Sequence, residues 1–376
     1  MRVMANKIFF NGLNELRALA AFAVLFHHIE LYKHYLSIDS LYNYSIVKHF
    51  IENLGKNGVY LFFVLSGFLI TYLLLEEKLQ TGKISVSKFY GRRILRIWPL
   101  YFIILGIGFF LIPFIYFSFP NFFEAQGFYN ERIKNLVYGK NLLLFLFFLS
   151  NIALQLFGGV AGAAQSWSVS VEEQFYFIWP WIVKWFYNTL WIVLVIIIVA
   201  ATIINHNIDV IRTCPFLHAF FISFNVDFMA MGALTAIAYR KYNTLIRTII
   251  VLRPVIGIVL FMVLIHLYFE ISHITLGLSF GLLILIFIEN KIENKLFSEL
   301  GKWSYGIYMY HPLVMYLSFS FVDQIQITSF VWKNFAYYTL IITITVLLSR
   351  FSYRYIEMYF LKLKKKVSVI ESGDHL

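Results

Sequence analysis

Long apolar stretches, separated by short polar segments, run through nearly the whole chain. Such stretches are typical of membrane proteins, because a helix needs roughly 20 mostly apolar residues to cross a bilayer. We predict apolar helical segments at residues 13–31, 59–75, 95–117, 136–157, 172–185, 190–204, 216–239, 255–268, 274–288, 305–321 and 335–349. The pattern predicts an all-α integral membrane protein, a bundle of about ten transmembrane helices plus one re-entrant or interfacial segment.

The distribution of lysine and arginine predicts the orientation of these helices, because both residues collect on the cytoplasmic side of bacterial-type membrane proteins. With the N-terminus inside, 22 of the 31 lysine and arginine residues fall on the cytoplasmic side. Eight fall on the outer side, and Arg17 lies within the first helix. Both termini are then cytoplasmic, which requires an even number of crossings.

One of the eleven segments must therefore not cross, and we assign this role to residues 136–157. Lys184 on the inside makes the segment from Glu172 run inward, so the stretch before it begins and ends outside. Irregular backbone at membrane depth is tolerated where protein or a wet cavity surrounds it. Gly158, Gly159 and Gly162 give the chain freedom to turn there.

Composition supports the membrane assignment. Hydrophobic residues make up 60% of the chain, charged residues 14%, and the mean hydropathy is +0.74, whereas soluble domains have about 45–50% apolar and about 25% charged residues. The net charge of +11 is dispersed in short runs, so we expect no nucleic acid partner. The single cysteine, Cys214, excludes an internal disulfide and a Cys-rich metal site, and no metal is expected.

The chain is predicted to form one membrane domain at residues 1–361, followed by a polar cytoplasmic tail at residues 362–376. The first 31 residues also resemble a signal peptide, since Ala18, Ala20 and Ala21 are small. Against cleavage, Arg17 lies late in the stretch and the apolar run continues to Phe26.

The first helix carries two polar residues that point the same way. Arg17 and His28 are eleven residues apart, which is within roughly 20° of three full turns and about 16 Å along the axis. His27 points elsewhere. An arginine inside an apolar helix normally faces the bundle interior and is a functional candidate. The alternative is that Arg17 extends to the inner surface and His28 lies in the outer headgroup layer.

Two further patterns lie near the predicted cytoplasmic side. Arg93 and Arg96 are spaced i, i+3, and such a pair can face one ligand, because arginine forks suit phosphate oxygens. The alternative is that Arg93 and Arg96 only flank the cytoplasmic end of a membrane span, where positive residues are common. Ser66 and Gly67 lie mid-span, where small residues let helices approach closely, so packing alone would also explain them.

The stretch SWSVSVEEQFYFIWP is the most unusual. Glu172 and Glu173 open an apolar segment from the outer side, and Ser168 shares a helix face with Glu172 at i, i+4. Carboxylates in such a place need a reason, although either acid could simply flank a helix start. In a later span, His311 lies about midway, where a lone histidine is more often a satisfied interior residue than a base.

Together these motifs resemble the acyltransferase 3 family of multi-spanning membrane acyltransferases, which includes many O-acetyltransferases of bacterial surface glycans. The resemblance covers nearly the whole chain, in order. The matching residues are Arg17 and His28; Ser66, Gly67 and Phe68; Arg93 and Arg96; Trp167, Ser168, Val171, Glu172, Glu173, Gln174, Phe175 and Tyr176; Ser304, Tyr305, His311 and Pro312; and Tyr353, Arg354 and Glu357.

Two departures limit the resemblance. Members often have Asp-Gly before the Leu-Arg of the first helix, where this sequence has Asn14 and Glu15. Many members also carry an extracytoplasmic esterase-like domain, and this sequence ends without one, so no second catalytic step is expected on the same polypeptide.

The resemblance implies transfer of an acyl group, most often acetyl, from cytoplasmic acyl-CoA to a hydroxyl of a glycan or lipid-linked sugar outside. It also implies location in a bacterial cytoplasmic (inner) membrane. The expected partners are acyl-CoA, the acceptor and membrane lipid, with no permanently bound cofactor. Histidine can supply the base that hydroxyl attack on a thioester needs, and His28 lies toward the outer face.

Each candidate residue then has an expected role. Catalysis is assigned to His28, Glu172 and Ser168, with Ser168 and Glu172 orienting His28 or the acceptor hydroxyl. Donor binding is assigned to Arg17, Arg93 and Arg96. Structural or substrate-lining roles go to Ser66, Gly67, Phe68, Glu173, Tyr305 and His311. Direct transfer is favoured over a cysteine-linked intermediate, because Cys214 shows no matching base.

Two other classes of protein remain open from the sequence. A secondary transporter or flippase also combines multi-spanning helices with buried arginine, histidine and glutamate. It would require an ion gradient and no acyl-CoA. A noncatalytic membrane assembly partner would be insensitive to replacement of His28.

Overall fold

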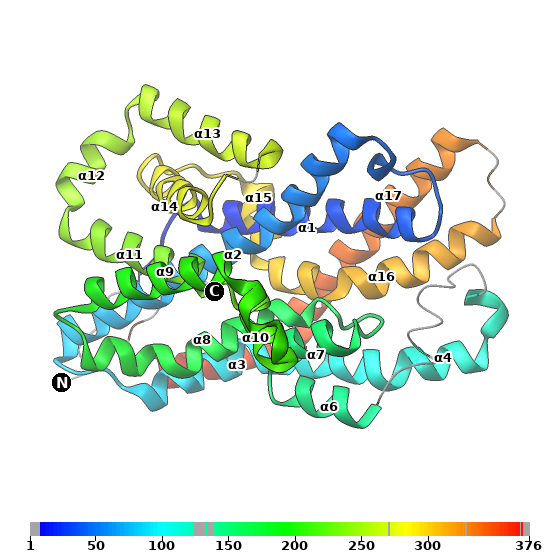
Figure 1. Cartoon of the computed structure of the whole chain (residues 1–376), viewed down its shortest axis with the longest axis horizontal. Coiled ribbons are helices and arrows are strands. Elements are labelled where there is room, and N and C mark those ends of the chain that lie inside the picture. The colour runs from blue at the N-terminus through cyan, green and yellow to red at the C-terminus, as the bar shows by residue number, and fades with distance from the viewer. Residues whose placement is uncertain are drawn as a thin grey trace.

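The computed structural model describes residues 8–123, 133, 138–269, 271–325, 327, 329–368 and 370. The regular elements of this part of the chain are all helices and include no β-strand, which confirms the predicted all-α class (Figure 1). The α-helices are α1 (Leu13–Tyr35), α2 (Ser45–Thr81), α3 (Val86–Gly106), α4 (Ile112–Ser118), α6 (Tyr138–Leu146), α7 (Ser150–Phe157), α8 (Ser166–Trp185), α9 (Leu190–His206), α10 (Pro215–Phe224), α11 (Val226–Lys241), α12 (Asn243–Ile250), α13 (Arg253–Tyr268), α14 (His273–Glu289), α15 (Lys295–Lys302), α16 (Ser304–Gln324), α17 (Phe330–Ser352) and α18 (Met358–Val367). Short 3₁₀ or π segments are η1 (Leu41–Asn43), η2 (Ile107–Leu111), η3 (Pro120–Phe123), η4 (Ile208–Thr213) and η5 (Tyr353–Glu357).

Four helical stretches in this part of the chain are long and apolar enough to cross a membrane: Ser45–Thr81, Val86–Ser118, Pro215–Lys241 and Phe330–Lys365. The bent pair α12 and α13, with an angle of 82° between its helices, would make a fifth if it formed one span. Two shorter apolar helices, α9 and α14, add to these. The total of about ten crossings therefore stays a prediction.

The described parts of all eleven predicted apolar segments are helical, but several are broken. Residues 138–157 form two short helices, α6 and α7, which meet at Phe148 with a positive φ of 56°. Neither is long enough to cross a bilayer alone; residues 136 and 137 lie outside the described part. Gly158 and Gly162, with φ of 83° and 71°, then turn the chain into α8. The predicted turning role of these two glycines is confirmed.

Helix α2 is central to the packing, because α1 and α11 lie directly against it (Figure 1). At the crossing of α2 and α11, a Cβ on Gly67 would lie 2.0 Å from the Met229 carbonyl oxygen. A Cβ on Gly232 would lie 2.1 Å from that of Val64. Glycine therefore brings the two backbones into direct contact, as small residues do between membrane helices.

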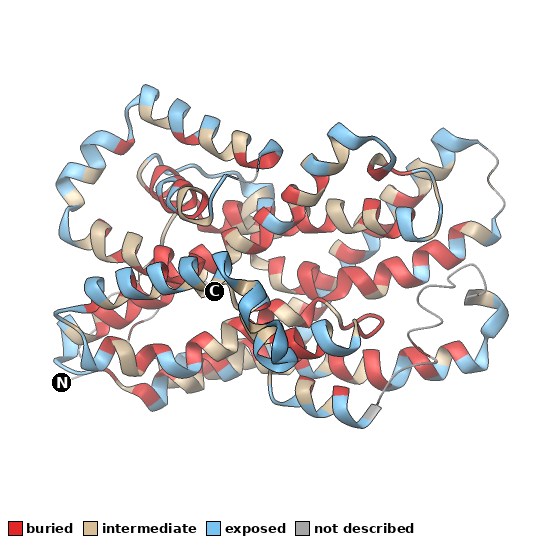
Figure 2. Cartoon of the chain, in the orientation of Figure 1, coloured by how far each residue is buried: buried red, intermediate tan, exposed pale blue. Residues whose placement is uncertain are grey.

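Exposed positions lie along the outer helices of this bundle (Figure 2), and many of them carry large apolar side chains. Phe177, Trp191, Phe261 and Val331 are among the most exposed. Polar and charged side chains such as Glu30, Asn151 and Ser166 are instead fully buried. This distribution is what a bilayer favours, since lipid tails accept apolar groups and polar groups must find partners inside the protein.

The last helix belongs to the bundle. Helix α18 packs against α3, and Val367 lies 3.7 Å from the position of a Cβ on Gly91. The predicted polar tail from residue 362 therefore begins inside a packed helix, while residues 369 and 371–376 lie outside the described part. The π segment η5 leads directly into α18, and π turns are often found at functional sites.

Replacement of Gly67 by alanine is expected to destabilise the protein by about 1–3 kcal/mol, because the new methyl group would overlap the α11 backbone. Thermal unfolding of the purified protein in detergent would measure this. The control is Gly257→Ala, since no heavy atom lies within 4 Å of a Cβ there. Equal stability of the two variants would contradict the close crossing.

Candidate functional site

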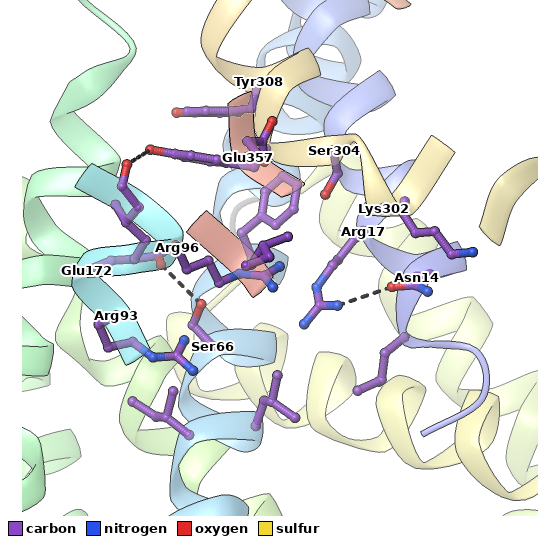
Figure 3. Close-up of a pocket in the computed structure, with 18 of the residues that line it drawn as sticks. Asn14, Arg17, Ser66, Arg93, Arg96, Glu172, Lys302, Ser304, Tyr308 and Glu357 are labelled. Atoms are coloured by element: carbon purple, nitrogen blue, oxygen red, sulfur yellow. Dashed lines mark hydrogen bonds between the residues drawn. The ribbon is translucent and has the colours of Figure 1, made fainter. Parts of the chain in front are cut away.

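A cavity of about 240 Å³ lies between helices that are far apart in the sequence (Figure 3). Its wall is formed by side chains from α1, α2, α3, α8, α15, α16, η5 and α18. The cavity thus collects residues from all six sequence motifs: the first helix, the Ser66 stretch, the Arg93–Arg96 pair, the Glu172 stretch, the late Ser304–Tyr305 stretch and the closing Tyr353–Glu357 stretch.

Six cations and two carboxylates line the cavity. The cations are Arg17, Arg93, Arg96, Lys302, Lys364 and Lys365, and the acids are Glu172 and Glu357. Arg17 approaches from the side opposite Arg93 and Arg96, so that basic groups face one another across the space (Figure 3). Arg93 and Arg96, predicted near the cytoplasmic side, thus share one cavity with Glu172, which was predicted to open its segment from the outer side.

Arg93, the first arginine of the i, i+3 pair, differs from its neighbour Arg92 in its partners. Arg92 is neutralised by Glu77, at 3.1 Å between its Nη2 and the carboxylate oxygen. Arg93 instead stacks near the rings of Phe89 and Tyr176, and its buried Nε has no hydrogen-bond partner in the described structure. Arg93 is only 8% exposed, so its charge is directed into the cavity and not into solvent.

Glu172 is held from two sides. Its Oε2 accepts hydrogen bonds from Tyr176 Oη at 2.6 Å and from Ser66 Oγ at 3.2 Å. Helix α8 begins at Ser166, six residues before Glu172. The alternative that Glu172 or Glu173 flanks a helix start is therefore wrong, because both lie well inside the helix and are held by side-chain hydrogen bonds.

Ser168 and Tyr308 line the cavity together. Their hydroxyl oxygens are 2.7 Å apart, and both side chains are buried. Tyr305, one turn before Tyr308, donates a hydrogen bond to the Ile97 carbonyl of α3 at 2.8 Å. These bonds tie α16 to α8 and α3 around the cavity.

A pair of histidines lies on the other side of Tyr308. The rings of Tyr308 and His311 are 5.8 Å apart, and those of His311 and His28 are 4.9 Å apart. Neither histidine lines the cavity. Arg17 and His28 thus share a helix face, as predicted, but Arg17 faces the cavity and His28 faces His311.

The hydrogen bonds of the two histidines define their tautomers. Nδ1 of His28 lies 2.9 Å from the Val24 carbonyl oxygen, and Nδ1 of His311 lies 3.3 Å from that of Ile307. A carbonyl oxygen only accepts, so in each neutral ring Nδ1 carries the proton and Nε2 keeps its lone pair. Nε2 of His311 is buried without a partner in the described structure. Both rings therefore present an unprotonated Nε2 that can accept a hydrogen bond.

His27 is oriented differently, as the helical phase predicts. Its Nδ1 lies 3.0 Å from the Ile51 carbonyl oxygen and 3.0 Å from the Tyr42 hydroxyl. Its ring fills the space left by Gly55, where a Cβ would lie 2.3 Å away. These contacts join α1 to α2 and η1.

Ser168 and Glu172 do not contact His28 in the described structure. Tyr308 stands between Ser168 and the histidine pair, and Glu172 is bonded to Ser66 and Tyr176. Both side chains line the cavity, where they can contact a bound ligand.

The remaining predicted residues divide into lining and packing positions. Ser66 and Tyr305 line the cavity. Gly67 makes the α11 crossing, and Phe68 is fully buried against Phe10 and Tyr72. Glu173 accepts a hydrogen bond from Trp98 Nε1 at 3.0 Å and does not line the cavity.

Four lining residues were missed as candidates from the sequence: Lys302, Tyr308, Lys364 and Lys365. Lys302 directly precedes the Trp-Ser-Tyr stretch, and Tyr308 shares a helix face with His311 at i, i+3. The sequence did not indicate a binding role for Lys364 and Lys365, because a run of lysines near a chain end resembles a solvated tail. No group of three or more potential metal ligands occurs among the described residues.

A buried charge cluster fixes the C-terminal end of α1, two residues beyond His28. Glu30 pairs with Lys33 at 2.7 Å and accepts hydrogen bonds from the Leu41 backbone at 2.6 Å and from Ser40 Oγ at 2.9 Å. The Tyr338 hydroxyl of α17 donates to the same carboxylate. Glu30 is 0% exposed and Lys33 4%. The cluster therefore holds α1 against both η1 and α17.

Fold and cavity together define a helical membrane protein with a buried, strongly cationic site. The family model for an acyltransferase domain, acyltransferase 3, matches residues 10–354. The chain belongs to this acyltransferase family.

Individual relatives agree with the family. The chain is 27% identical over 376 residues to the O-acetyltransferase OatA of Staphylococcus aureus strain NCTC 8325 / PS 47, covering 92% of this chain and 56% of that protein. It is 29% identical over 170 residues to the peptidoglycan O-acetyltransferase OatA of Listeria monocytogenes, covering 45% of this chain and 23% of that protein. The chain thus spans only about half the length of the Staphylococcus relative. No solved structure matches the chain significantly.

Replacement of Glu30 by alanine is expected to destabilise the protein by about 3–5 kcal/mol, because Lys33 would be left buried without its counter-charge. The matched control is Asp209→Ala, which removes an i, i+3 pair with Arg212 that is exposed. An exposed pair contributes at most about 1 kcal/mol. Thermal unfolding in detergent compares the two; equal shifts would contradict a stabilising role for the buried cluster.

Proposed function

We propose that this protein is a membrane O-acyltransferase, which moves an acyl group, most simply acetyl, from cytoplasmic acyl-CoA to a hydroxyl of an extracytoplasmic glycan or lipid-linked sugar. The observation that carries the proposal is the pairing of two sites along one helix. Arg17 of α1 lines a cationic cavity, and a pair of adjacent imidazoles includes His28 of the same helix. Family membership makes acyl transfer the reaction that such a pairing would serve.

The cavity suits the donor. Coenzyme A carries phosphates, and arginine binds phosphate oxygens through its planar fork. Arg17, Arg93 and Arg96 would bind the donor there. The thioester end would extend toward the uncharged end of the cavity at Ser168 and Tyr308.

The histidine pair suits the acceptor. In the proposed step, Nε2 of His28 takes the proton of the acceptor hydroxyl, and the hydroxyl oxygen bonds to the thioester carbonyl carbon. The carbon–sulfur bond then breaks, and His28 returns the proton to the coenzyme A thiolate. The step is complete without a covalent enzyme intermediate, in agreement with the exposed position of Cys214.

His311 would support this step from α16. Its ring is adjacent to His28, and its own Nε2 is unpaired in the described structure. A hydroxyl placed between the two rings could hydrogen-bond to either nitrogen. Ser168 and Glu172 would act on the donor side, because both line the cavity.

The acceptor class follows from the relatives. Both are named O-acetyltransferases, and the Listeria protein is named for peptidoglycan. We therefore propose a cell-surface glycan as acceptor, and a location in the bacterial cytoplasmic membrane with both termini inside. Residues 1–361 would form the membrane domain, to which α18 adds a wall of the donor cavity.

Mass analysis of surface polysaccharide from cells with and without the gene would test this function. We expect an increment of about 42 Da per modified sugar, the mass that acetyl adds when it replaces a hydroxyl hydrogen. An unchanged glycan, together with an ion-gradient-dependent movement of a solute, would instead indicate a transporter.

Replacement of His28 by alanine is expected to lower transfer by about 10²–10⁴-fold, the usual contribution of a general base. The assay would use proteoliposomes that contain labelled acetyl-CoA, with the glycan acceptor outside. His27→Asn is the comparison variant, because the ring of His27 lies beside that of His28, at 4.8 Å, but its hydrogen-bond partners are Ile51 and Tyr42. Full activity of the His28 variant at normal protein levels would contradict the assignment of His28 as the general base.

A further inference from the structure

The C-terminal helix α18 contributes two lysines to the cavity. Lys364 is only 9% exposed, and Lys365 lines the same wall from a more exposed position. Lys362, on the same helix, is exposed and does not line the cavity. Of the α18 lysines whose side chains are described, Lys364 and Lys365 line the cavity and Lys362 does not.

The position of Lys364 is fixed by the packing of its helix. Helix α18 lies against α3, the helix that carries Arg93 and Arg96, and η5 connects it without a break to α17. Arg96, Arg93, Arg92 and Arg17 all act electrostatically on the Lys364 amine. Lys364 forms no ion pair with any described residue.

Such a cluster of like charges has a cost. Charges removed from water need counter-charges close by, and an unpaired one is strongly destabilising. Among the charged lining residues, Glu172 and Glu357 can offset two of the six cations. Lys302 pairs with Glu299 at 2.7 Å. With Arg17 left out of the count, Arg93, Arg96, Lys364 and Lys365 still outnumber the two acids among the described lining residues, so this part of the wall is suited to a multivalent anion.

We propose that Lys364 and Lys365 bind the phosphates of coenzyme A, so that α18 forms a phosphate-binding wall of the donor site. This inference rests on the proposed function and adds a subsite to it. Coenzyme A carries a diphosphate with two charges and a 3′-phosphate with roughly −1.5 to −2 at neutral pH. Its negative charge therefore complements the positive excess of the cavity.

The two lysines have distinct positions for this role. Lys364 lies deep, beside the arginines that grip phosphate with a planar fork, and adds a point charge. Lys365 and Ser368 lie at the more exposed end of the wall, where the 3′-phosphate would be bound. The uncharged pantetheine arm would then run past Glu172 toward Ser168 and Tyr308.

Calorimetric binding to the purified protein in detergent would test the wall with three probes: coenzyme A, 3′-dephospho-coenzyme A and pantetheine. We expect Lys364→Gln combined with Lys365→Gln to weaken coenzyme A binding at least about tenfold, since two charge-assisted contacts are lost. Weak pantetheine binding should not change. Lys362→Gln, the matched control, and Lys364→Arg, which keeps the charge, should both bind coenzyme A as the unmodified protein does.

The outcomes separate the inference from the proposed function. Failure of the unmodified protein to bind coenzyme A would overturn both. Equal binding of coenzyme A by the unmodified protein and the double variant would overturn only the inference. Equal loss for coenzyme A and pantetheine would show a structural role and overturn it as well. The inference would also fail if the double variant kept coenzyme A binding but lost binding to vesicles of phosphatidylglycerol, because the phosphate would then be a lipid headgroup.

Discussion

The direct backbone contact between α2 and its neighbours is the constraint on which the other features depend. Gly67 and Gly232 let α11 touch α2, and Gly58 does the same for α1, since a Cβ there would lie 2.8 Å from the Ala20 carbonyl oxygen. Lipid tails are as apolar as leucine, so membrane helices associate through such close packing and through hydrogen bonds. With α1 pressed against α2, Arg17 and Ser66 meet in one cavity and His27 fills the site at Gly55. The chemistry of α1 thus relies on glycines of α2.

Charge placement adds a second constraint. The N-terminal part of α1 borders a cavity whose described lining holds more cations than acids, whereas at its C-terminal end Glu30 is paired with Lys33 and accepts a hydrogen bond from Tyr338. The structural cluster differs from the binding site in whether its positive and negative charges compensate each other. The Glu30 cluster satisfies its charges internally, as stable buried groups do. The Arg93 and Lys364 region does not, which is typical of a site that a ligand completes.

The sequence predicted the apolar helices well, because long apolar runs leave little choice inside a bilayer. The starts of α1 at Leu13 and α9 at Leu190 agree with the predicted segments. The ends of α2 were not foreseen, since its N-terminal part contains polar and charged residues. Breaks such as those at Phe148 and Asn225 depend on single positive φ values that the apolar pattern does not contain. Helical phase placed Arg17 and His28 on one face of α1. It carries no information about Tyr308 of α16, which lies between the cavity that Arg17 lines and the histidine pair that contains His28. The lysines of α18 join the cavity only through tertiary packing.

The position of Tyr308 has a consequence for the membrane as a barrier. A cationic cavity on one side and two imidazoles on the other would conduct protons if a column of water joined them. The Tyr308 side chain contacts both regions: its hydroxyl lies 2.7 Å from Ser168 Oγ in the cavity wall, and its ring lies 5.8 Å from that of His311. In the proposed transfer, an acyl group that passes from the cavity to the histidine pair would have to pass this side chain. Between turnovers the same side chain would keep water, and therefore protons, from passing freely between the two sites.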